Sequence, residues 1–79
     1  MKYLIVEDFS GQPVSFLFPR RVDHADMREQ LPYGTVISAG FAELADGEFR
    51  CSGGSQALGL TARPEEDAAV LAEALRIRA

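Results

Sequence analysis

The pattern that most constrains the fold is that of an amphipathic helix near the end of the chain, from Pro64 to Ile77. Pro64 stands where a first-turn proline is tolerated, and the acidic residues after it favour the positive end of the helix dipole. Four apolar residues recur at helical spacing and form one stripe: Ala68, Leu71, Ala72 and Leu75. A helix with one apolar stripe must bury it against another element, so the rest of the chain has to supply an apolar surface.

Short β-strands are expected to supply that surface. The continuous apolar run from Tyr3 to Val6 is typical of a strand buried on both faces. Residues 14–18 form a second strand that Pro19 ends, and the short connection rich in turn residues predicts a hairpin. Further strands are expected at residues 35–44, 48–51 and 56–60, with a type I′ turn at Asp46-Gly47 between the first two of these. Gly40, inside a strand, indicates a bulge or a close backbone approach.

A second helix is expected from Ala25 to Leu31. Asp23 precedes it as a candidate N-cap, because its carboxylate can accept hydrogen bonds from free amides of the first turn. Met27 and Leu31 lie four residues apart and therefore share one face. The segment Pro32-Tyr33-Gly34 ends the helix.

Together these patterns predict one α+β domain over residues 1–79. It has a small, mostly antiparallel sheet of four to five strands and two helices, in the order ββαββ(β)α. We expect both helices to cover one face of the sheet. The other face then meets solvent or a second copy of the chain, since a core this small gains from added burial.

Charge and cysteine content limit the function classes. Twelve acidic residues against eight basic ones leave a net charge of −4, which argues against general nucleic-acid binding. Cys51 is the only cysteine, so no intramolecular disulfide can form and a reducing cytoplasm is the expected compartment. The apolar run at Tyr3 meets Glu7 too soon to be a signal peptide or a membrane span, so no membrane association is expected.

Cys51 and His24 are the one pair that could form a thiolate–imidazole nucleophile. That chemistry needs the imidazole within hydrogen-bond reach of the sulfur and a third group that orients it, for which Asp26 is a candidate. A free cysteine inside a strand is more often a small buried hydrophobic residue, and a histidine beside a helix start is ordinary. We therefore expect no enzymatic activity and keep the pair as the alternative.

Two kinds of ligand site are conceivable, one around His24 and one at the glycine-rich segment. His24 with Asp23 and Asp26 could begin a metal site, but there is no second histidine, and helix capping explains the carboxylates. The segment from Ser52 to Ser55 could cradle an anion on successive amides, yet it lacks the ending of a phosphate-binding loop. A turn explains Ser55 equally well, so no metal or cofactor is expected.

Arg63 is the last candidate, because it stands near the start of the C-terminal helix. With Arg50 it could bind an acidic group. The simpler interpretation is that both arginines are solvated or pair with neighbouring carboxylates, with a small contribution to stability. The neighbouring carboxylates that could pair with the two arginines are those of Glu48, Glu65 and Glu66.

Four segments resemble small uncharacterised proteins encoded in bacterial phages and prophages. These segments are His24-Ala25-Asp26, Val36–Phe41, Cys51–Leu60 and Arg63–Ala68. The resemblance covers most of the chain. It implies a phage-derived bacterial context and an accessory or host-interaction role, and it implies no catalytic residues.

The leading hypothesis is a non-enzymatic accessory protein that binds a protein partner and can form a homodimer. The first alternative is a small enzyme or ligand binder that uses Cys51 and His24. The second alternative is a nucleic-acid accessory protein, which requires several arginines to converge on one face. Those arginines are Arg20, Arg21, Arg28, Arg76 and Arg78.

Overall fold

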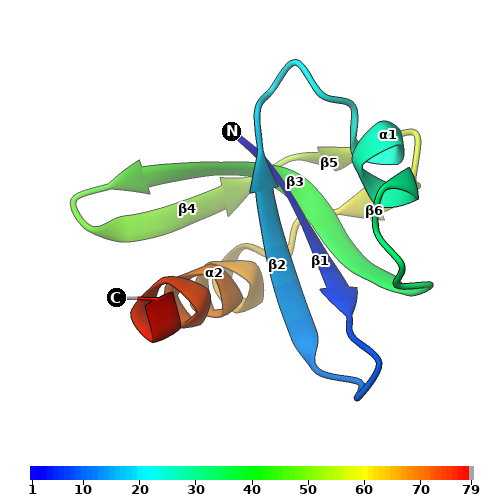
Figure 1. The fold of residues 1–79 in the computed structure, drawn as a ribbon. Helices are drawn as coiled ribbons and strands as arrows, with labels where there is room; N and C mark the ends of the chain where they lie inside the picture. The colour runs from blue at the N-terminus through cyan, green and yellow to red at the C-terminus, as the bar shows by residue number, and fades with distance from the viewer. Residues whose placement is uncertain (79) are drawn as a thin grey trace.

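The computed structural model describes the backbone of residues 1–78 and the side chains up to Leu75. Eight elements follow one another along the chain: β1 (Lys2–Glu7), β2 (Pro13–Phe18), α1 (His24–Glu29), β3 (Val36–Ala45), β4 (Glu48–Ser52), β5 (Gly54–Ser55), β6 (Leu60–Thr61) and α2 (Pro64–Arg78). Figure 1 shows them as one sheet of four strands with a small two-stranded sheet beside it. The α+β class is confirmed, and neither helix in this part of the chain is long and apolar enough to cross a membrane.

The main sheet is antiparallel throughout and has the order β2-β1-β3-β4. Strand β1 lies inside the sheet, and Tyr3, Leu4, Ile5 and Val6 are completely buried. The sequence predicted this from the continuous apolar run. A strand covered on both sides has no reason to alternate apolar and polar residues.

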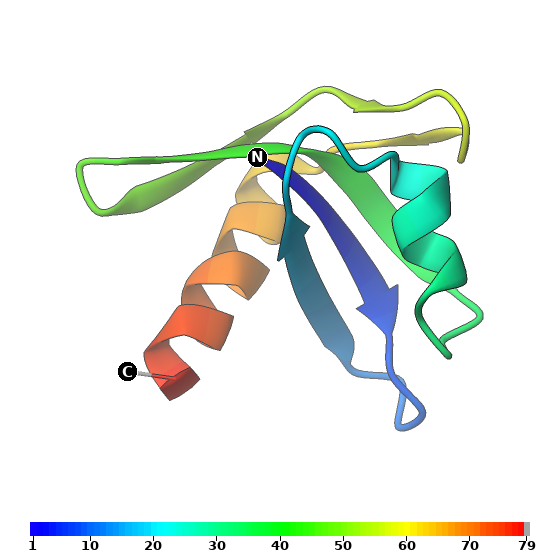
Figure 2. The ribbon, with the colours of Figure 1, turned by 45° about the horizontal axis from the view of Figure 1, so that its top comes forward.

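The two helices pack on opposite faces of this sheet, so the prediction that they share one face is wrong. Successive side chains of a strand point to opposite faces. Tyr3 and Ile5 form one core cluster with Leu71 of α2. Leu4 belongs to a second cluster that includes Met27 of α1. Figures 1 and 2 show α1 and α2 on either side of the sheet. The physical reason is that β1 is apolar on both faces and requires cover on both.

Helix α2 occupies the residues that the sequence predicted, but its buried side is rotated from the expected stripe. Leu71 is buried and Ala68 packs beside it, as expected. Ala72 is exposed, and Leu75 is 44% exposed. Asp67, instead of these two residues, is fully buried on the side of α2 that faces the sheet. A pattern search based on hydrophobicity alone misses this because it treats a carboxylate as a solvent-facing group.

Helix α1 is shorter than predicted and is not capped as predicted. It begins at His24 and ends at Glu29. Asp23 occupies the N-cap position, but its side chain makes no capping hydrogen bond and lies 3.8 Å from the Lys2 ammonium. Met27 and Leu31 pack on the same cluster, although Leu31 lies beyond the end of α1 and so does not share a helical face with Met27.

The predicted hairpin between β3 and β4 is present, whereas the predicted strand at residues 56–60 is not. Asp46 and Gly47 both have positive φ, as a type I′ turn requires. Residues 56–59 form a turn between β5 and β6, which pair as a separate two-stranded sheet. The bulge lies near Ile37, where three residues of β3 span two residues of β1. It does not lie at Gly40.

Gly40 does lie at a close backbone approach, the second of the two features that a glycine inside a strand indicates. A Cβ atom added there would lie 2.5 Å from the carbonyl oxygen of Ser52 and 3.2 Å from the ring of Tyr3. The neighbour at 2.5 Å is backbone inside the same sheet and cannot move away cheaply. Gly40 is therefore required by lack of space.

We expect Gly40→Ala to destabilise the fold by about 1–3 kcal/mol, because the added methyl overpacks β3 against β4. Urea denaturation would measure the change. Gly34→Ala is the matched control, since nothing lies within 4 Å of its added Cβ. It should change the free energy of unfolding by less than about 0.5 kcal/mol. Equal stability of the two variants would contradict the close approach.

Candidate functional site

Cys51 and His24 lie on opposite faces of the main sheet. Cys51 packs with Tyr3, Ile5 and Leu71 on the α2 face. The imidazole of His24 contacts Phe18 and Phe41 on the α1 face. The sheet separates sulfur and imidazole, so this arrangement does not form the thiolate–imidazole pair that the sequence suggested.

Cys51 has the environment of a small buried hydrophobic residue. It is 7% exposed and pairs with Ala42 across β3 and β4. Burial raises the pKa of its thiol, and the nearby negative charge of Asp67 raises the pKa further, against a smaller lowering by a hydrogen bond with Tyr3. A thiol held in its protonated form is a poor nucleophile.

His24 fastens the start of α1 to the sheet. Its Nε2 lies 3.0 Å from the carbonyl oxygen of Gly40, and its ring stands edge-on to Phe18 and Phe41 with centroids 5.5 and 5.9 Å apart. Asp23 and Asp26 lie toward solvent. Within the described part of the chain, no three histidine, cysteine or carboxylate side chains gather closely enough to hold a metal ion.

The glycine-rich segment forms the connection into the small sheet. The hydroxyl of Ser55 accepts a hydrogen bond from the amide of Leu58 at 3.3 Å, and the carbonyl of Gly53 accepts one from Ala62 at 2.9 Å. Ser55 is buried, so its hydroxyl supports the turn at residues 55–58. The shallow hollow there holds about 360 Å³ and is lined by residues of this segment.

Arg63 pairs with Asp67, one helical turn away, and not with the carboxylates that the sequence suggested. Its Nη2 and Nε donate to Oδ1 of Asp67 at 2.9 and 3.1 Å, and its backbone amide donates to Oδ2 at 2.8 Å. The hydroxyl of Tyr3 donates to Oδ2 at 2.5 Å, and that of Ser38 to Oδ1 at 2.8 Å. We call Asp67 with these three partners the Asp67 network.

The Asp67 network keeps a buried carboxylate ionised. Burial acts to raise the pKa of Asp67, but the hydrogen bonds from Tyr3, from Arg63 and from Ser38 outweigh it and lower the pKa. The pKa of Tyr3 is raised far above its ordinary value, first by burial and then by the hydrogen bond to Asp67 and by its charge. Every polar group of the network has a partner, which is the arrangement of a structural group.

Sequence reasoning missed the Asp67 network. Asp67 was assigned to the helix dipole together with its acidic neighbours Glu65 and Glu66, which are exposed. One signal was available: Asp67 precedes Leu71 by four residues, and so lies on the same side of the helix as that apolar residue. That position predicts a partner for the carboxylate but does not identify Tyr3 or Ser38.

The arginines of the nucleic-acid alternative are dispersed. The guanidinium of Arg20 lies 5.2 Å from the ring centre of Phe41, and Arg28 donates to the carbonyl of Gly34. The end of α2 that carries Arg76 and Arg78 lies away from the loop that carries Arg20 (Figures 1 and 2). The side chains of Arg76 and Arg78 lie outside the described residues.

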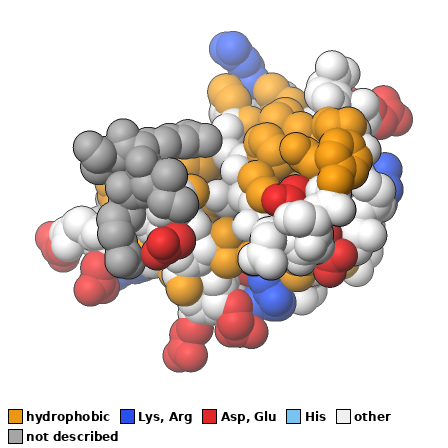
Figure 3. Space-filling view, turned by 60° about the horizontal axis from the view of Figure 1, so that its bottom comes forward, with side chains coloured by type: hydrophobic (Ala, Val, Ile, Leu, Met, Phe, Trp, Pro, Cys, Tyr) orange, Lys and Arg blue, Asp and Glu red, His pale blue; other side chains and the backbone are white. Residues whose placement is uncertain are grey.

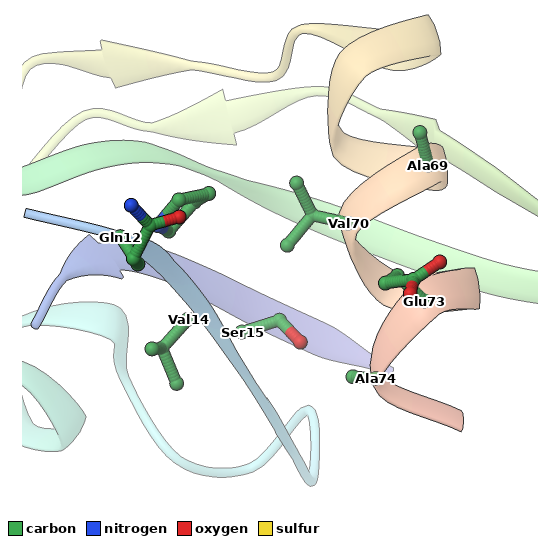
Figure 4. A pocket seen from close by; sticks show the side chains of 8 residues that line it. Gln12, Val14, Ser15, Ala69, Val70, Glu73 and Ala74 are labelled. Atoms are coloured by element: carbon green, nitrogen blue, oxygen red, sulfur yellow. The ribbon is translucent and has the colours of Figure 1, made fainter. Parts of the chain in front are cut away.

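A groove of about 580 Å³ separates strand β2 from helix α2. The residues that line it are mostly apolar or small: Gln12, Pro13, Val14, Ser15, Ala69, Val70, Glu73 and Ala74. We call it the β2–α2 groove. Figure 4 shows the side chains of the strand and of the helix on its two sides. A hollow of about 140 Å³ shares Ser15 and Ala74 with it and adds three leucines, Leu17, Leu71 and Leu75.

Two partly exposed leucines lie beside the groove. Leu17 and Leu75 remain 38% and 44% exposed beside it. Figure 3 views the molecule from below Figure 1 and shows hydrophobic side chains gathered on one side and acidic ones along its lower edge. Comparison of the chain with protein families, with curated proteins and with solved structures gave no match.

Asp67→Asn should destabilise the protein by about 2–3 kcal/mol at neutral pH. It removes a buried charge from three partners, and the cost is moderated because the arginine left behind is 37% exposed and solvated. Because the pKa of Asp67 is lowered on folding, its contribution is present above about pH 4 and is lost as pH falls through the lowered pKa. The difference between variant and wild type should therefore shrink in acid.

Urea denaturation at a series of pH values would measure this difference. Glu66→Gln is the control, because Glu66 is an exposed carboxylate in the same turn of α2. It should change stability by less than about 0.5 kcal/mol. A difference for Asp67→Asn that stays constant down to pH 2 would show that the carboxylate's charge does not carry the effect.

Cys51 should react with a thiol reagent on the order of a hundredfold more slowly in the native protein than in denaturant, because it is buried and its pKa is raised. Absorbance of the released reagent group at neutral pH would give both rates. Rapid native-state labelling would restore the hypothesis of a reactive cysteine.

Proposed function

We propose that this protein is a non-enzymatic accessory protein that works by binding another protein at the β2–α2 groove. The observation that carries the proposal is the groove itself: an apolar depression of about 580 Å³ between a sheet edge and a helix.

The chemistry of the groove supports binding more than catalysis. Among the described residues that line it, Glu73 is the one with a charged side chain. The nearby buried polar groups Tyr3, Ser38 and Asp67 are engaged with one another. A surface of small and apolar side chains beside exposed leucines is typical of a contact site for another chain.

The wider context is part of the same proposal. The resemblance to phage and prophage proteins supports an accessory or host-interaction role. The single free cysteine, Cys51, is compatible with the reducing cytoplasm. A homodimer would use a sheet edge, because α1 and α2 cover opposite faces of the sheet.

The two alternatives have less support. The enzyme hypothesis relied on Cys51 and His24, which lie on opposite faces of the sheet. The nucleic-acid hypothesis required converging arginines, whereas Arg20 stacks on Phe41 and Arg28 bonds a backbone carbonyl.

Affinity capture from a bacterial host lysate, compared between two matched variants, tests the proposal. Ala69 and Ala72 are both exposed on α2, but only Ala69 lines the groove. Ala69→Arg should reduce the recovery of a specific partner at least about tenfold, and Ala72→Arg should leave it within about twofold. Both substitutions keep a good helix former, so circular dichroism should show the same fold for each.

Light scattering during size exclusion tests the homodimer part. A dimer that Ala69→Arg dissociates and Ala72→Arg does not would place the second copy at the groove. Partner recovery that is equal for wild type and both variants would refute the groove as the binding site.

A further inference from the structure

We draw no further inference here: the strongest candidate, the uncharged edge of strand β2 along the β2–α2 groove, belongs to the site already described, and nothing in the structure shows what covers it.

Discussion

The buried carboxylate of Asp67 is the interaction on which the arrangement of helix and sheet depends. It joins three parts of the chain that are far apart in sequence: Tyr3 on β1, Ser38 on β3 and Arg63 at the start of α2. A fully buried carboxylate is costly unless its hydrogen-bonding capacity is filled. The orientation that satisfies both oxygens therefore restricts how the first turn of α2 can lie on the sheet.

The position of α2 determines which surface remains open. The helix packs closely along β4 and approaches β2 less extensively. The groove lies on the β2 side, where Val70 and Ala74 face the edge strand across a space that no described side chain fills. The groove lies where α2, which the Asp67 network joins to β1 and β3, leaves β2 partly uncovered.

Local sequence patterns predicted the helices and strands well. How these elements are arranged depends on long-range strand pairing. The apolar run at Tyr3–Val6, the Asp46-Gly47 turn and the span of α2 are each encoded within a few neighbouring residues, and each was correct. The face of the sheet that α1 covers depends on the pairing of β1 with both β2 and β3. This long-range pairing cannot be predicted from a local sequence pattern. The same pairing separates Cys51 from His24 and brings Tyr3 to Asp67, so the candidate site was the least predictable part.

The two edges of the main sheet differ in charge, because β4 carries Glu48 and Arg50 and β2 carries no charged residue. Strand β1, the most apolar segment, is buried between β2 and β3. This order leaves β2 as an edge strand of the sheet. An uncharged edge strand exposes the chain to unwanted pairing. Among the described residues that line the adjacent groove one is a carboxylate, Glu73, whereas β2 itself carries no charged side chain.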